Sequence, residues 1–281
     1  MKLKMKLMAA AVALAASAGA NAAMDNFMSG NSSLAFIALD YTGSPISVMM
    51  DLDFNVDSFL PTAMSAAGTI IQWNFNTNSL TVNGVASGST QTNWSNAMSS
   101  FSATAQSTET KWGVIGGDSL SDGTFGDIRY LSTAKPGTTL ATMQGQTKSN
   151  LSGFSLIGDL YNANNLLQTT ENGENGSTAT SGQAWVGDGG TFGNAGKWQN
   201  KSSWVTWANV GETADFYMVD SNNGINSTRA LITPYAGAFS YDAGVLTYAV
   251  AAVPEPSEYA LMLAGLGMIG FMARRRLNNR A

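Results

Sequence analysis

Short segments of strand character, separated by clusters of Gly, Asn, Asp and Ser, run through most of this 281-residue chain. Segments of this length that end where turn-forming residues gather are typical of β-sheet proteins. The segments that we predict as strands are 33–40, 46–54, 69–75, 79–82, 112–115, 128–131, 203–208, 214–219, 236–241 and 245–250. Their number and spacing predict a mainly β fold, with a single β-sandwich-like domain.

Two further segments have apolar residues at helical spacing. In 94–101 and again in 151–161, apolar side chains recur at steps of three and four, each time after an asparagine in the position of a helix cap. The two faces are Trp94, Ala97, Met98 and Phe101 after Asn93, and Leu151, Phe154, Ile157, Leu160 and Tyr161 after Asn150. We expect two short helices whose apolar faces pack into the core rather than form binding grooves.

Turn residues punctuate the predicted strands. Asn83-Gly84 and Asn223-Gly224 fit tight turns with positive φ, and Asp242-Ala243-Gly244 would join the last two strands as a hairpin. Residues 169–196 are rich in Gly, Thr, Ser and Asn, which predicts a long, flexible, exposed loop. We expect Trp185 to anchor this loop in the core, and a contact between Trp185 and a ligand is the alternative.

The N-terminus has the features of a secretory signal peptide. Three lysines in the first six residues precede an Ala-rich apolar run at 7–18, and the small residues Ala20 and Ala22 follow as a cleavage site. The run is too short to span a bilayer as a permanent anchor. We predict export through the Sec translocase, removal of 1–22 after Ala22, and an ectodomain over 23–252.

Between its termini the chain is acidic. Seven of the fourteen Lys and Arg residues lie in the two terminal segments, so 23–253 has seven cations against seventeen acids, a net charge of −10. A protein that binds nucleic acid needs cations to replace the counterions of the phosphates. The charge therefore excludes a nucleic-acid partner, and it disfavours binding to anionic lipid as well.

The chain contains neither His nor Cys. The usual zinc ligand, the common general base near neutral pH and the central residue of a Ser-His-Asp triad are therefore absent. Thiol nucleophiles and disulfides are absent too, although an exported domain of this size can bury a core without disulfides. We predict no catalytic residue, no cofactor and no metal.

One short motif resembles an enzyme signature. Residues 117–123, Gly-Asp-Ser-Leu-Ser-Asp-Gly, are similar to the first conserved block of the GDSL esterases and lipases, in which the Ser is the nucleophile. That family also needs a C-terminal His to activate the Ser, and this chain has none. Gly-Asp-Ser and Ser-Asp-Gly are also common turn sequences. We therefore interpret Ser119 as a turn residue rather than a nucleophile.

Residues 51–57 carry oxygen ligands at alternate positions, as a calcium loop does. The Gly and Glu that an EF-hand requires at its sixth and twelfth positions are missing. As a strand, the same stretch has apolar residues on one face and Asp51, Asp53 and Asp57 on the other, which predicts a half-buried strand. Three carboxylates along one face would repel unless solvent or a cation separates them. Calcium binding thus stays open as an alternative.

The C-terminus combines two prolines, an apolar run and a cluster of arginines. Prolines at 254 and 256 favour extended conformations for the residues before them, which predicts an exposed, extended segment of the shape that proteases bind. The apolar run 259–273 would be about 22 Å long as a helix, against about 30 Å for the hydrocarbon core of a bilayer. We expect a short transmembrane helix that serves as a temporary anchor, with a cytoplasmic tail at 277–281.

This tail resembles the PEP-CTERM sorting signal, a module also catalogued as the C-terminal domain of ice-binding proteins. The resemblance spans 253–276, under a tenth of the chain, and an N-terminal signal peptide accompanies it as in that family. The matching residues are Val253, Pro254, Glu255, Pro256, Ser257, Arg274, Arg275 and Arg276. It implies that an exosortase, a membrane-embedded protease of Gram-negative bacteria that make exopolysaccharide, cuts the tail and passes the domain to the cell surface or extracellular matrix.

The sequence therefore predicts an exported, non-catalytic surface or matrix protein, associated with exopolysaccharide or biofilm. Two alternatives stay open. One is a glycan hydrolase that acts through carboxylates such as Asp118, Asp122 and Asp127, since glycoside hydrolysis needs no His. The other is ice binding, which rests only on the second name of the tail module.

Overall fold

The computed structural model describes most of the chain from Met24 to Asn278. The described residues are 24–25, 30–87, 94–106, 108–119, 128–148, 155–167, 175–187, 192–193, 195–197, 204–222, 228–252 and 256–278. The predicted signal peptide, with Ala20 and Ala22, lies outside them.

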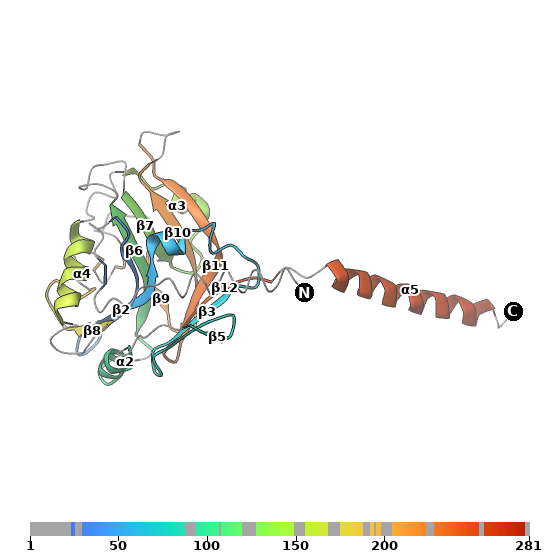
Figure 1. The fold of residues 1–281 in the computed structure, drawn as a ribbon, viewed down its shortest axis with the longest axis horizontal. Helices are drawn as coiled ribbons and strands as arrows, with labels where there is room; N and C mark the ends of the chain where they lie inside the picture. Colours follow the sequence, from blue (N-terminus) through green and yellow to red (C-terminus); the bar gives the residue numbers. More distant parts are fainter. Residues whose placement is uncertain are drawn as a thin grey trace.

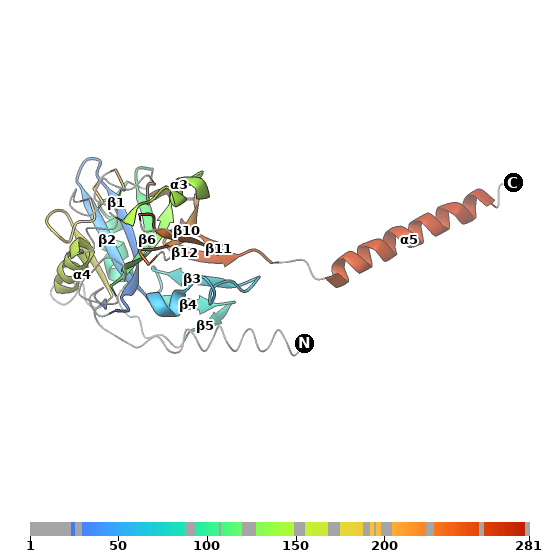
Figure 2. The same ribbon diagram turned by 90° about the horizontal axis from the view of Figure 1, so that it is seen from above.

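Strands dominate the described part of the chain and join into one antiparallel sheet (Figures 1 and 2). They are β1 (Ser33–Asp40), β2 (Ile46–Asn55), β3 (Ile70–Asn74), β4 (Ser79–Val82), β5 (Val85–Ala86), β6 (Lys111–Ser119), β7 (Ile128–Ala134), β8 (Gly176–Ala179), β9 (Ala208–Asn209), β10 (Thr213–Asp220), β11 (Leu231–Asp242) and β12 (Val245–Val250). Their order in the sheet is β5-β4-β3-β12-β11-β10-β7-β6-β1-β2-β8, and β9 pairs with β6. The mainly β prediction is confirmed.

The sheet curls until strands that are distant in its order touch. The indole of Trp73 on β3 donates a hydrogen bond to the carbonyl oxygen of Leu52 on β2, with 2.7 Å between the two atoms. The ring of Phe36 on β1 lies 4.9 Å from that of Phe75 and 4.8 Å from that of Tyr241 on β11. A continuous curled sheet, rather than the predicted sandwich of two sheets, thus encloses the first core, because hydrogen bonding continues unbroken along the path from β5 to β8.

A second core covers the outer face of the strands around β1. Along this strand, Phe36 and its alternate neighbours enter the first core, whereas Ile37 and its alternate neighbours enter the second. Helix α4 (Ser155–Leu167) and helix α3 (Leu140–Gln144) contribute buried residues to the second core. Burial on both faces explains why β1 is an almost uninterrupted apolar run.

Both predicted helices are present. Helix α2 (Trp94–Ser102) buries Trp94, Ala97, Met98 and Phe101, the predicted face, against the first core. Helix α4 buries Ile157, Leu160 and Tyr161, whereas the first two residues of its predicted face lie outside the described residues. The sequence does not predict α3, whose single apolar contact to the core, Met143, is too little for a periodic signal.

One loop prediction and one strand prediction need correction. Residues 176–179 of the predicted flexible loop form the edge strand β8, in which Ser47 of β2 pairs with Ala179. Trp185 packs against the second core, as predicted. The predicted strand 203–208 is wrong for 204–207, because among the described residues strand pairing begins at Ala208, in β9. Side-chain packing of the tryptophans there, rather than strand pairing, accounts for the apolar run.

The turns follow the prediction where they are described. Asn83 and Gly84 both have positive φ, 52° and 77°, between β4 and β5. Ala243 and Gly244, with φ of 47° and 81°, connect β11 to β12 as the predicted hairpin. Asn223-Gly224 lies outside the described residues.

Candidate functional site

The C-terminal segment forms a helix that stands apart from the sheet domain. Helix α5 runs from Pro256 to Asn278 and projects away from the domain in both views (Figures 1 and 2). It begins three residues before the predicted 259–273 because proline suits the first helical position, where its missing N–H is not needed. Pro256 and Ser257 are therefore helical, and Val253 and Glu255, for which an extended conformation was predicted, lie outside the described residues.

The described side chains of α5 are almost all exposed, although most of them are apolar. Its large apolar side chains are 58–73 % exposed, and they are Leu261, Met262, Leu263, Leu266, Met268, Ile269 and Met272. Isolated apolar residues on a surface need no explanation, but a whole helix of them marks a site that another phase or protein covers.

None of the helices in the described part of the chain is long and apolar enough to cross a membrane. The predicted transmembrane helix 259–273 is therefore not confirmed. All three arginines, Arg274, Arg275 and Arg276, belong to α5, and Arg275 is exposed.

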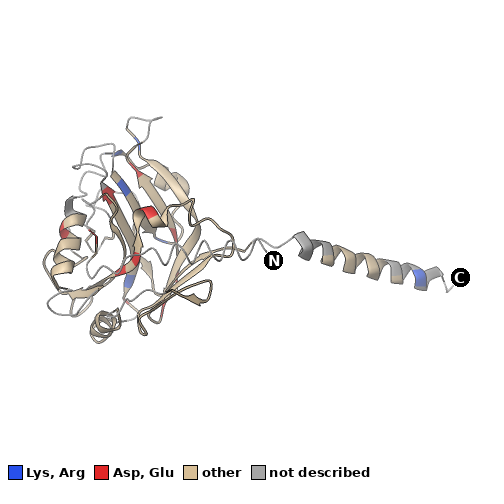
Figure 3. Ribbon diagram, in the orientation of Figure 1, with Lys and Arg blue, Asp and Glu red and all other residues tan. Residues whose placement is uncertain are grey.

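Figure 3 shows how charge is distributed along this helix. The described part of α5 carries no charge colouring until a blue band near its C-terminal end. Cations in the last turns of a helix interact favourably with its dipole. From Tyr259 to Ala273 the sequence of the helix is apolar and uncharged, and a basic end follows.

The Gly-Asp-Ser motif occupies the end of a strand. Gly117, Asp118 and Ser119 continue β6 and pair with β7, with Ser119 opposite Ile128. The prediction of a turn is therefore wrong for these three residues, because the ladder with β7 extends to the end of the motif.

Arg129 on β7 lies between two carboxylates. Its Nη2 atom is 2.9 Å from Oδ1 of Asp57 and also bonds to Oδ2 of Asp118. Burial raises the pKa of Asp118, and the hydrogen bond and charge of Arg129 oppose this shift. Of the three carboxylates in the hydrolase alternative, Asp118 is therefore buried in an ion pair, and Asp122 and Asp127 lie outside the described residues.

The structure does not bring Asp51, Asp53 and Asp57 together as the calcium alternative requires. Asp57 faces Arg129, whereas Asp51 and Asp53 are buried in β2. Asp53 has a φ of 62°, at an irregularity in the pairing of β1 with β2, which interrupts the alternation of side chains. The strand is buried on both faces rather than half-buried. Among the described residues there is no group of three or more acidic side chains that could hold a metal ion.

Asp51 is an acid inside the protein. Its Oδ2 accepts a hydrogen bond from the Ser33 hydroxyl at 3.1 Å, and its Oδ1 accepts one from the Asp53 backbone N–H at 2.9 Å. Burial raises the pKa of Asp51 to about 7, and the charges of Asp53 and Asp25 contribute in the same direction. Nearby, the Tyr161 hydroxyl donates to the Ser33 carbonyl oxygen at 2.9 Å. The group is enclosed by protein and is not open to a substrate.

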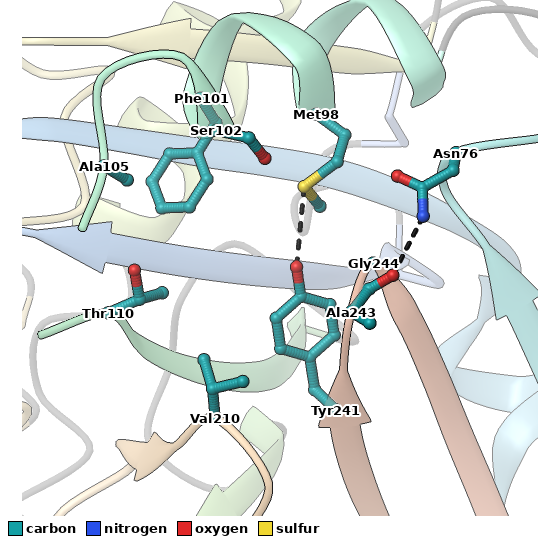
Figure 4. Close-up of a pocket in the computed structure, with 10 residues that line it drawn as sticks. All are labelled: Asn76, Met98, Phe101, Ser102, Ala105, Thr110, Val210, Tyr241, Ala243 and Gly244. Carbon is teal, nitrogen blue, oxygen red and sulfur yellow. Dashed lines mark hydrogen bonds between the residues drawn. The ribbon is translucent and has the colours of Figure 1, made fainter. Parts of the chain in front are cut away.

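A pocket of about 260 Å³ opens between α2 and the β11–β12 hairpin (Figure 4). It is lined by Asn76, Met98, Phe101, Ser102, Ala105, Thr110, Val210, Tyr241, Ala243 and Gly244. The hydroxyl of Tyr241 donates to Met98 Sδ at 3.5 Å, and Asn76 Nδ2 donates to the Ala243 carbonyl oxygen at 2.9 Å. Sequence patterns do not predict this pocket, because its walls come from two parts of the chain, 76–110 and 210–244, that are a hundred residues apart.

Comparison with known proteins identifies the C-terminal segment. Residues 252–276 match the family described as the PEP-CTERM protein-sorting motif. No curated protein and no solved structure matches the chain. The match begins one residue before the resemblance seen in the sequence and ends at the same arginine. The motif implies export, transient membrane anchoring and processing by an exosortase, and α5 with the segment before it is therefore the PEP-CTERM sorting signal of this protein.

Proposed function

We propose that this chain is a non-catalytic protein of the cell surface or extracellular matrix, released from its tail and associated with exopolysaccharide. The observation that carries the proposal is the match of 252–276 to the PEP-CTERM protein-sorting motif. A sorting signal of this kind directs its domain to the envelope, so the domain acts outside the cytoplasm.

The geometry of the tail supports its removal. An apolar helix with most of its described side chains exposed is unfavourable in water, at roughly 25 cal/mol per Å² of apolar surface. In the precursor a membrane would cover this surface, and in the released protein cleavage would remove it. The cut falls near Glu255, between the last strand and α5.

The ectodomain supports a role without catalysis. It lacks His and Cys, and two of its buried acids, Asp118 and Asp51, are held in structural contacts. Its negative charge keeps it apart from nucleic acids and anionic lipids. An uncharged or weakly charged polysaccharide is the envelope polymer that this surface suits.

Intact-mass spectrometry of the protein from envelope and medium tests the processing. We expect the extracellular form to lack 1–22 and the residues after about Glu255. A double variant, Pro254→Ala with Pro256→Ala, should accumulate with its tail in the envelope, while Pro45→Ala, at an exposed proline of the ectodomain, should be processed normally. An extracellular form that keeps Arg274 to Arg276 would contradict the proposal.

Matrix association requires a separate experiment. Deletion of the gene should lower the amount of exopolysaccharide retained in the biofilm, and the released protein should co-purify with the polymer. Reducing ends released from the polymer by the pure protein would instead favour the hydrolase. Unchanged biofilm together with no co-purification would contradict the matrix role.

A further inference from the structure

We propose that the pocket between α2 and the β11–β12 hairpin binds one neutral pyranose ring of a polysaccharide. The inference rests on the proposed matrix role and names the ligand class within it. It is drawn from the size, charge and hydrogen-bonding groups of the pocket, each of which narrows the class of ligand.

The volume limits the ligand to a small molecule. The pocket has a volume of about 260 Å³. Sites for drug-sized ligands are larger, about 300–1,000 Å³. One six-membered sugar ring is of the right size, and further rings of a chain would have to lie outside the opening.

The lining carries no charge. All ten lining residues have neutral side chains, and the larger apolar ones are Met98 and Phe101 on α2 and Val210 across the pocket from them. A carboxylate, phosphate or ammonium group would lose its hydration there without gaining a partner of opposite charge. The ligand is therefore a neutral molecule. It has an apolar face to pack on the apolar side chains of the pocket and polar groups to bond with the polar ones.

The Tyr241 hydroxyl is a buried donor with a poor acceptor. It donates to Met98 Sδ at 3.5 Å, and a thioether is a weak acceptor, while the backbone N–H of Gly244 interacts with the Tyr241 oxygen. Burial and, to a lesser degree, the charge of Asp242 raise the pKa of Tyr241 to about 12, so the hydroxyl keeps its proton at neutral pH. A ligand hydroxyl in the pocket would give it a much better acceptor.

The remaining polar groups complement hydroxyls. Figure 4 shows Oδ1 of Asn76 directed toward the pocket, while its Nδ2 is engaged by Ala243. The Thr110 hydroxyl donates to Gln106 at 3.0 Å, which leaves its oxygen free to accept. Ser102 adds a hydroxyl at the exposed rim. Groups that donate and groups that accept are thus mixed, as sugar hydroxyls require.

The hairpin holds this arrangement in place before a ligand arrives. Phe75 N–H donates to the Gly244 carbonyl oxygen at 2.9 Å, and Asn76 packs so closely on Gly244 that a Cβ there would lie 2.4 Å from Asn76 Nδ2. A rigid site loses less conformational entropy on binding, which favours affinity.

Ligand-observed NMR on the full chain tests the proposal, in micelles of a detergent without a sugar headgroup. The probes are methyl β-D-glucopyranoside, its galacto and manno isomers, and methyl β-D-glucuronoside as the charged analogue. We expect at least one neutral probe to bind with a Kd on the order of 1 mM, as suits about a dozen heavy atoms. The glucuronoside should bind at least tenfold more weakly than its neutral counterpart.

Variants locate the binding. Ser102→Trp, which fills the rim from the exposed end of α2, should abolish the signal, whereas Ser99→Trp, exposed on the same helix away from the lining, should preserve it. Tyr241→Phe removes only the hydroxyl and should weaken binding about tenfold, with an unchanged melting curve as evidence of folding.

The outcomes are distinct. No signal with any neutral probe at 50 mM, binding that survives Ser102→Trp, or equal binding of the glucuronoside would each overturn the pocket assignment. Co-purification with exopolysaccharide alongside such a result would show that only the pocket inference has failed. Loss of co-purification with the pocket binding intact would instead count against the matrix role.

Discussion

Asp51 should make the stability of the domain depend on pH near neutrality. It is 4 % exposed, and burial raises its pKa from 3.8 to about 7 in the folded protein. Between these two values the folded state holds a proton that the unfolded state has released. The stability that this proton confers is therefore fully present below about pH 4 and is lost as the pH rises through 7.

The magnitude follows from this interval. Each pH unit over which the two states differ by one proton changes the free energy of unfolding by about 1.4 kcal/mol. An interval of roughly three units corresponds to about 4 kcal/mol, a large share of the ~5–15 kcal/mol that stabilises a typical domain. Asp40 and Glu212 have lowered pKa values and so act in the opposite direction, which is why the contribution of Asp51 has to be isolated by substitution.

The substitution Asp51→Asn isolates the contribution of Asp51 to the pH dependence of stability. Asparagine keeps an acceptor for the Asp53 N–H and has no ionisable group. Urea unfolding followed by tryptophan fluorescence at pH 4, 5, 6, 7 and 8 gives the free energy for both proteins. The free energy of unfolding of the variant, relative to that of the unsubstituted protein, should rise by about 4 kcal/mol between pH 4 and pH 8. Asp215→Asn, at an exposed position on β10, should change the free energy by less than about 0.5 kcal/mol at every pH.

Two results would refute this reasoning. A difference between Asp51→Asn and the unsubstituted protein that stays constant across the pH range would mean that Asp51 does not titrate differently on folding. A variant that loses stability relative to the unsubstituted protein as the pH rises would mean that the ionised carboxylate is the form that the fold stabilises.

The same urea titration at pH 7 checks three further substitutions. Gly244→Ala should cost at least about 1 kcal/mol more than Gly84→Ala, because both have positive φ but only the first meets a neighbouring side chain; equal costs would exclude the collision. Tyr161→Phe should cost about 1 kcal/mol by removing a buried hydrogen bond, and Tyr41→Phe, at an exposed ring, close to nothing. Asn165→Ala should cost about 1–2 kcal/mol, because the Asn165 side-chain amide makes two 2.8 Å hydrogen bonds, one to the backbone N–H and one to the carbonyl oxygen of Met24. No loss of stability would show that these bonds do not hold Met24 in place.

Strand positions were largely predictable because they depend on local patterns. The bounds of β1, β4 and β12 agree with the prediction at both ends, since apolar side chains and turn residues mark them. The strands β5 and β9 escaped prediction because two residues carry no periodicity, and β8 escaped because its Gly-Ser-Thr-Ala sequence has the composition of a loop. Only pairing with a neighbour makes these segments strands.

Of the two candidate sites, the sorting signal was predictable from local sequence and the pocket was not. The sorting signal is a continuous stretch with a recognisable order of proline, apolar and basic residues, so the sequence alone is sufficient to find it. The pocket depends on Met98 and Tyr241 meeting across 143 positions of the chain. Each residue has an ordinary place in its own helix or strand, and neither pattern indicates a cavity.

Residues 51–57 show most directly what a one-dimensional pattern cannot decide. Alternation puts three carboxylates on one face, but the positive φ of Asp53 and the pairing of Asp57 with Arg129 separate them.

By itself, the sequence determined the mainly β class, two helical faces, the absence of histidine and thiol chemistry, and the sorting signal. These depend on composition and on neighbours within a few residues. The curled continuous sheet, the burial of Asp51 and the pocket beside Tyr241 were decided by the tertiary structure. They arise from contacts between residues far apart in the chain, whose free energy no local pattern contains.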